Sequence, residues 1–266
     1  MALPSLNEHE GQKKLSPLTG PADPGPTISG WLSHVSAGRD RSTLRVLDVG
    51  CGRGDTVAWL VAEGFDAHGV ELRESYIAHG RDYLGPDRLT LIENGSYPYP
   101  DDYFDIVISD QVFEHVSDLD ELAKEVARVT KPGGVGLHVF PAKWTLVEPH
   151  LHSPIVHWFP KGPIRRAAID VALRAGWAAP YFSDRPRAER RAIFSDYSED
   201  ETFYRHPAQI RRILDKSGLS ADFREVSRER VLMQLGNPNL PSSVKRMLAW
   251  AYRSTRMMYL TTVKRD

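Results

Sequence analysis

The chain has 266 residues, of which 41% are hydrophobic and 26% charged, and its formal net charge is −1. This composition allows a full apolar core, and the near-neutral charge gives no reason to expect nucleic acid or an anionic membrane as a partner. The single cysteine, Cys51, excludes an intrachain disulfide, no apolar run is long enough to span a bilayer, and the first residues lack a signal-peptide pattern, so we expect a cytoplasmic location.

Strand and helix patterns alternate along most of the chain. Residues 1–26, rich in proline and glycine, are expected to form a flexible tail, followed by a short helix over 28–37. The predicted strands are 44–50, 66–72, 89–94, 104–110, 135–140, 221–227 and 257–265; the predicted helices are 55–64, 74–84, 119–130 and 207–218, with a turn at 131–134. This alternation predicts an α/β fold with a doubly wound, Rossmann-like sheet of seven mostly parallel strands.

Two stretches, 142–205 and 228–256, break the alternation, and each follows a predicted strand. Ligands of open α/β sheets bind beyond the carboxyl ends of the strands, so we expect 142–205 to form an inserted, mainly helical substrate lid. The predicted division is a tail at 1–26, a ligand-binding core at 27–141, the lid at 142–205, and the end of the core at 206–266 with a smaller insertion at 228–256.

The stretch VLDVGCGRG at residues 46–54 joins the first predicted strand to the next helix. Gly50 and Gly52 can adopt positive φ and let the backbone approach a ligand, while the following helix directs its free N–H groups to the same place. Glu71 ends the second predicted strand, where a carboxylate can accept hydrogen bonds from both hydroxyls of a ribose. The loop and the acid together indicate a nucleoside ligand.

The loop departs from the dinucleotide-binding pattern GxGxxG, because its third glycine, Gly54, comes one position early. Asp48 stands just before the loop, where a carboxylate would repel a pyrophosphate. It would suit a ligand with a cationic amino group instead. This points to S-adenosylmethionine, whose sulfur is also positive, and argues against a dehydrogenase.

Four stretches in order, VLDVGCGRG, GVEL, YPYPDDYFDIVISDQVFEHV and TKPGG, resemble the class I S-adenosylmethionine-dependent methyltransferases over about residues 44–141. The resemblance implies that 27–141 binds S-adenosylmethionine and that S-adenosylhomocysteine is a product. It assigns to the cofactor Asp48, Gly50, Cys51, Gly52, Glu71, Leu72, Glu93, Asn94 and Asp110. It places Asp110 and Gln111 at the methyl-transfer end, and it gives Cys51 a space-filling rather than a nucleophilic role.

The start of the predicted lid, residues 141–160, contains Glu148, His150, His152 and His157. A histidine at this rim could take a proton from a hydroxyl nucleophile, and His150 is our first candidate for this catalytic base. A metal held by Glu148, His150 and His152 is one alternative, and a purely structural role in turns and packing is another. We expect no metal.

Basic side chains follow over 161–191, at Lys161, Arg165, Arg166, Arg174, Arg185, Arg187, Arg190 and Arg191. They form either a solvated face or an attraction for an acidic substrate, such as a phosphorylated or lipid-linked one. The expected function is methyl transfer to an oxygen of a small molecule. The alternatives are N-methylation, RNA methylation and a catalytically silent cofactor-binding protein; neither the acceptor nor the oligomeric state follows from the sequence.

Overall fold

The computed structural model describes residues 18–224, 226, 243–244, 247 and 256–266, and its centre is a seven-stranded sheet in the order β3-β2-β1-β4-β5-β9-β8. The parallel neighbours are β1 (Arg45–Val49), β2 (Asp66–Glu71), β3 (Leu89–Leu91), β4 (Phe104–Asp110) and β5 (Thr130–Pro141). β9 (Met257–Lys264) lies antiparallel to both β5 and β8 (Leu219–Asp222). The predicted α/β class with a mostly parallel seven-stranded sheet is confirmed.

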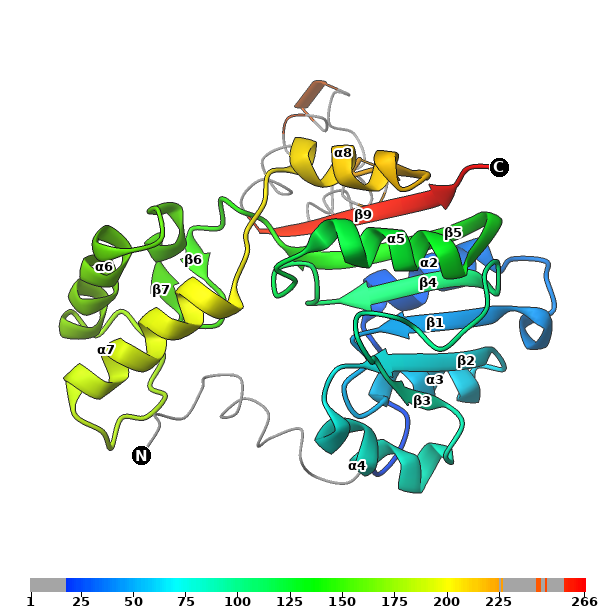
Figure 1. Cartoon of the computed structure of the whole chain (residues 1–266), viewed down its shortest axis with the longest axis horizontal. Helices are drawn as coiled ribbons and strands as arrows, with labels where there is room; N and C mark the ends of the chain where they lie inside the picture. Colours follow the sequence, from blue (N-terminus) through cyan, green and yellow to red (C-terminus); the bar gives the residue numbers. More distant parts are fainter. Residues whose placement is uncertain (1–17, 225, 227–242, 245–246, 248–255) are drawn as a thin grey trace.

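Helices cover both faces of this sheet (Figure 1). One face packs against α2 (Pro26–Val35), α3 (Asp55–Ala62) and α4 (Glu74–Leu84), the other against α5 (Leu119–Val129) and α8 (Pro207–Lys216). The valines, leucines and isoleucines of the central strands are buried on both faces, as expected for parallel strands between two helical layers. The predicted helices are present, with ends that differ by at most two residues.

Three predicted segments differ from the structure by more than two residues. The turn predicted at 131–134 is a bulge inside β5, because Phe104 pairs with Thr130 while Ile106 pairs with Val135. β3 ends at Leu91 rather than at residue 94, since the chain turns at Asn94 and Gly95, both with positive φ. The strand predicted at 221–227 runs from residue 219 to 222, and part of the predicted range lies outside the described residues.

The inserted segment 142–205 folds as a unit with an apolar core of its own. It contains β6 (Val147–Glu148), β7 (Ser153–Pro154), the 3-10 turn η2 (Val156–Trp158), α6 (Pro163–Arg174), α7 (Arg187–Asp196) and the π-helical turn η3 (Tyr197–Glu201). Its core includes Leu151, Ile169, Phe194 and Tyr197. The unit lies beyond the carboxyl ends of the central strands (Figure 1), and its role as a substrate lid stays a prediction.

Most of the predicted tail and nearly all of the insertion at 228–256 lie outside the described residues. Over the part of the chain that is described, no helix combines the length and the apolar character needed to cross a membrane.

Candidate active site

A cavity of about 770 Å³ opens where β1, β2 and β4 end. Its walls on the sheet side come from the loops after these strands, and its opposite wall comes from the inserted unit. The lining residues central to its chemistry are Gly50, Glu71, Leu72, Asp110, Gln111, His115, His150, Asp200 and Glu201. The strand order places a nucleotide-sized space at the carboxyl edge of the sheet, as the alternation of elements predicts.

The loop between β1 and α3 turns tightly because glycines with positive φ allow it. Gly50 has φ 72°, and its N–H and that of Cys51 donate to the carbonyl of Val70, which fastens the loop to β2. A Cβ at Gly50 would lie 2.5 Å from Cγ2 of Val112. Gly50 therefore meets both a conformational and a steric requirement at the cavity wall.

Glu71 ties the ends of the neighbouring strands together. Its Oε2 accepts a hydrogen bond from the N–H of Gly52 at 3.0 Å, and its Oε1 accepts from the N–H groups of Leu72 and Arg73 at 2.8 and 3.1 Å. These contacts hold the carboxylate at the cavity edge. The side chain of Leu72 is 69% exposed and offers an apolar surface beside it.

Asp48 is buried behind the cavity wall, close to three other acidic residues. Burial raises the pKa of its carboxyl well above the ordinary value, and the nearby carboxyls of Asp110, Glu71 and Asp55 raise it further. A cationic ligand in the cavity would relieve this repulsion. The excess of acidic groups therefore favours a positively charged ligand over a pyrophosphate.

The predicted cofactor residues divide into two sets. Those that line the cavity are Gly50, Glu71, Leu72 and Asp110; those that do not line it are Asp48, Cys51, Gly52, Glu93 and Asn94. From the segment after β3, Ile92 and Tyr97 line the cavity, while Glu93 and Asn94 are exposed. Contact of Glu93 and Asn94 with an adenine stays a prediction.

Gln111, which follows β4, has a backbone conformation that is rare for a residue with a side chain. Its φ is 56°, and its N–H donates to the carbonyl of Val139 at 2.8 Å. Non-glycine residues in this region cluster at functional sites because surrounding contacts must hold the strain. Here the turn brings both Asp110 and Gln111 to the cavity wall, and their place at the methyl-transfer end stays a prediction.

His150 faces the same cavity from the inserted unit, and a buried carboxylate holds its ring. Nδ1 of His150 lies 2.9 Å from Oε1 of Glu148, which also accepts a hydrogen bond from the hydroxyl of Tyr204 at 2.5 Å. The N–H of Leu151 donates to the other oxygen. Burial opposes ionisation of Glu148, but these hydrogen bonds and the electrostatic attraction of His150 outweigh it, so its pKa is lowered and the group is a carboxylate.

An ionised Glu148 can only accept, so the shared proton lies on Nδ1 of His150. In the neutral ring Nε2 is then the basic nitrogen. Sequence reasoning had named Glu148 only as a candidate beside His150. It missed Tyr204, because nothing in the local pattern indicates that a residue so far along the chain reaches Glu148.

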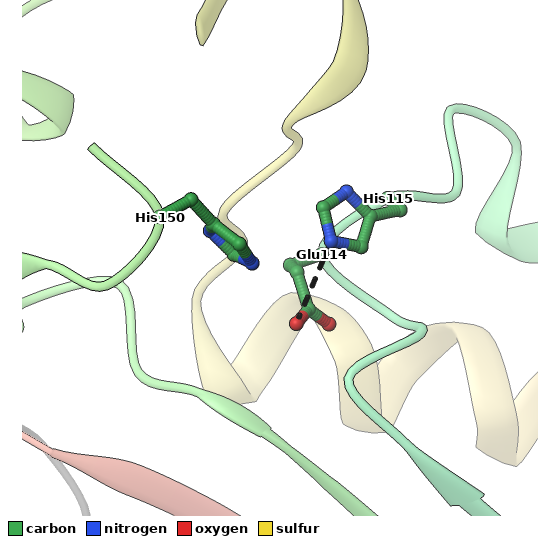
Figure 2. Close-up of side chains that lie close together, drawn as sticks. All are labelled: Glu114, His115 and His150. Atoms are coloured by element: carbon green, nitrogen blue, oxygen red, sulfur yellow. Dashed lines mark ion pairs between the residues drawn. The ribbon is translucent and has the colours of Figure 1, made fainter. Parts of the chain in front are cut away.

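Glu114, His115 and His150 lie close together beside the cavity (Figure 2). Nε2 of His115 is 3.9 Å from Oε1 of Glu114, and Nδ1 of His115 is 2.9 Å from the carbonyl of Glu201. Burial raises the pKa of Glu114 to about 8 and lowers that of His115 to about 4. At neutral pH both groups are therefore mainly uncharged.

The three side chains are of types that bind metals, and one ligand atom from each lies within 4.8 Å of the others. The buried carboxyl of Glu114 has no hydrogen-bond partner among the described residues. Protonation lowers the cost of burying this group without an ion, because a neutral carboxyl avoids the cost of a buried charge. The expectation of no metal stays a prediction.

Part of the sequence matches a known domain family. Residues 47–137 match the model of a methyltransferase domain, and this stretch contains β1 to β4, the glycine loop, Glu71 and Asp110. These residues form a class I methyltransferase domain. The methyltransferase domain thus includes the sheet side of the cavity, while His150 and the rest of the inserted unit lie outside the match.

Two relatives are similar to parts of the chain. Methyltransferase GfsG of Streptomyces halstedii is 35% identical over 107 residues, which cover 38% of this chain and 37% of that protein. The 2-methyl-6-phytyl-1,4-hydroquinone methyltransferase of Synechocystis sp. is 29% identical over 142 residues, or 52% of this chain and 41% of that protein. The chain thus spans about two fifths of the length of these relatives.

A solved structure resembles the fold of this chain over more than the methyltransferase domain. The S-adenosylmethionine dependent methyltransferase of Mesorhizobium loti matches 89% of this chain and 98% of its own, with a TM-score of 0.54 and 18% identity. This likeness shows a shared fold.

Proposed function

We propose that the protein transfers a methyl group from S-adenosylmethionine to an oxygen of a small-molecule acceptor. The observation that carries the proposal is the single cavity that brings Gly50, Glu71 and Asp110 from three strand ends to face His150 of the inserted unit. The name of the Synechocystis relative, which denotes a small hydroquinone, supports a small acceptor.

The residues present fit the cofactor. The acidic group of Asp48, Asp110 and Glu71 is suited to the positive charges of its sulfonium and ammonium groups, and Glu71 stands where a ribose hydroxyl could donate to it. Gly50 and Gly52 keep the loop free of side chains on the cofactor side, with Leu72 and Ile92 as apolar neighbours of the adenine. S-adenosylmethionine supplies an electrophilic methyl group when bound.

His150 is the proposed base in this reaction. Nε2 would take the proton of an acceptor hydroxyl as its oxygen attacks the methyl, and the Glu148 carboxylate would stabilise the imidazolium that forms. Glu148 and Tyr204 are positioning residues, because they hold the ring and do not line this cavity. An amine acceptor would have less need of such a base, which is why oxygen is preferred here over nitrogen.

The test has two stages. Calorimetric titration with S-adenosylmethionine should give saturable binding, which His150→Gln leaves unchanged. Incubation with pooled small-molecule acceptors and labelled cofactor should then release S-adenosylhomocysteine, and His150→Gln should slow this by about a hundredfold or more. His152→Gln is the matched control, because His152 is exposed and does not line the cavity.

Each possible result bears on a different part of the proposal. Absence of cofactor binding would overturn it entirely, whereas binding without turnover on any acceptor pool would favour a catalytically silent protein. A labelled methyl found on nitrogen or carbon by NMR of the product would overturn the oxygen assignment. Equal rates for His150→Gln and the parent would remove His150 as the base.

A further inference from the structure

A second cavity, of about 490 Å³, lies on the other side of the segment that closes the first one. Asp200 and Glu201 line the first cavity, and the next residues, Thr202 and Phe203, line the second. Tyr204 lines the second cavity and donates to the carboxylate of Glu148, which holds His150 at the first.

The walls of the second cavity carry positive charge only. Its cationic lining residues are Lys143, Lys161, Arg165 and Arg205, and no carboxylate side chain of the described residues lines it. None of the four forms a salt bridge with another described residue, whereas Arg166, Arg174, Arg185 and Arg187 of the same unit do. Arg166 pairs with Glu199, and Arg174 and Arg187 pair with Asp170 on the outer surface.

The excess of positive charge is clearest at Arg165, because its side chain is buried. Its guanidinium donates to the backbone carbonyls of Phe159, Ser198 and His157, and to no carboxylate. Arg205 likewise donates to carbonyls, including those of Val116 and Ser117. Carbonyl groups satisfy the N–H donors but leave the full positive charge in place, so both arginines contribute a fixed positive field.

The ammonium group of Lys161 makes two contacts at the wall of this cavity. The ammonium of Lys161 lies 4.1 Å from the ring centroid of Phe203 and donates to the carbonyl of Glu199. Burial and the nearby Arg165 lower the pKa of Lys161, as expected where positive charges crowd. His157, also in the wall and 3% exposed, has an Nδ1 without a hydrogen-bond partner in the described part of the chain.

We propose that this second cavity binds a phosphate group, with Lys143 and Lys161 as direct ligands and Arg165 and Arg205 supplying the field. A multiply charged anion is the ligand that several unpaired cations accommodate, and the rings of Trp158, Phe159 and Phe203 give its organic part an apolar wall. A role of this site in holding a phosphorylated acceptor rests on the proposed function, whereas phosphate binding itself does not.

Calorimetric titration of the full chain with inorganic phosphate and with pyrophosphate, at constant ionic strength, tests the site. We expect saturable binding of pyrophosphate, weaker binding of phosphate, and a loss of about tenfold or more in pyrophosphate affinity for the double variant Lys143→Gln/Lys161→Gln. Arg174→Gln is the matched control, since it removes one positive charge from the outer surface of the same unit and should leave the affinity unchanged.

The location is checked by the indole N–H signal of Trp158 in NMR spectra, assigned by its loss in Trp158→Phe. It should shift on addition of pyrophosphate in the parent and not in the double variant. Undiminished affinity in the double variant, equal losses in Arg174→Gln, or no binding of either anion would overturn the proposal.

Titration of the same samples with S-adenosylmethionine separates the two proposals. Pyrophosphate binding without cofactor binding would leave the anion site standing and remove the proposed function. Cofactor binding without binding of either anion would remove the anion site and leave the proposed function standing.

Discussion

Oε1 of Glu148 lies 2.9 Å from Nδ1 of His150, and the two side chains belong to a unit outside the methyltransferase domain match. The carboxylate is buried and held by the hydroxyl of Tyr204 and the N–H of Leu151. The pair therefore joins the inserted unit to the cavity that the sheet forms, and its consequences can be measured.

Glu148→Gln should lower the rate of methyl transfer by about a hundredfold while leaving S-adenosylmethionine affinity unchanged. The amide no longer carries the charge that stabilises a protonated His150. Tyr204→Phe should give a smaller loss, because it removes one of the hydrogen bonds that orient the carboxylate and keeps the charge. Rates and cofactor affinities are measured for both variants side by side. A larger loss of rate in Tyr204→Phe than in Glu148→Gln would contradict the prediction.

Asp48→Asn should change stability and cofactor affinity in opposite directions. The raised pKa of Asp48 means that its ionisation opposes folding once the pH exceeds the value for an unfolded chain, so the neutral variant should unfold at a higher temperature at pH 7 without cofactor. Its affinity for S-adenosylmethionine should fall about tenfold, because the attraction for a cationic ligand is reduced.

Thermal unfolding and calorimetric titration measure these two effects of Asp48→Asn. The exposed carboxylate of Asp82 in α4 provides the control, since Asp82→Asn should alter neither quantity. A destabilised Asp48→Asn protein, or one with undiminished cofactor affinity, would contradict the assignment of this residue.

Glu114→Gln should remove a pH-dependent loss of stability. The carboxyl of Glu114 ionises near its ordinary value of 4.5 in the unfolded chain but at about 8 in the folded protein. Its contribution to stability is therefore complete below about 4.5 and declines as the pH rises toward 8, a decline the amide cannot show.

The difference in unfolding temperature between Glu114→Gln and the parent should become more positive from about pH 5 to pH 8. Other titrating groups are common to both proteins and cancel in this difference. A difference that stays constant with pH would mean that Glu114 is not held protonated in the folded state.

Gly50→Ala should destabilise the protein and abolish cofactor binding. The substitution places a Cβ at positive φ, which costs about 1–2 kcal/mol, and also drives it against Val112. Gly38→Ala measures the conformational cost alone, because Gly38 has φ 73° and no atom within 4 Å of an added Cβ.

The double variant Gly50→Ala/Val112→Ala should recover part of the lost stability by removing the clash. Chemical unfolding of the four proteins gives the two costs separately. If Gly50→Ala lowered the free energy of unfolding no more than Gly38→Ala does, the close packing of the loop on Val112 would contribute nothing to stability.

Local patterns account for the core because its elements are defined by short-range periodicity. Runs such as residues 104–110 are apolar throughout and match a strand buried on both faces, and the stripe of Leu119, Val126 and Val129 matches a helix with one buried side. The bulge at 131–134 was not predictable, because proline and glycine there indicate a turn as well as they indicate a break in strand pairing.

The sequence by itself determined the α/β alternation, the glycine loop with its acid at Glu71, and the position of Asp110 and Gln111 after a strand. Only the tertiary structure decided that His150 faces this cavity, that Glu148 and Tyr204 hold its ring, and that four cations without a salt bridge among the described residues line a second cavity. The reason is physical: periodicity reports burial within one element, whereas the distance between side chains far apart in the chain depends on how separately folded units pack together.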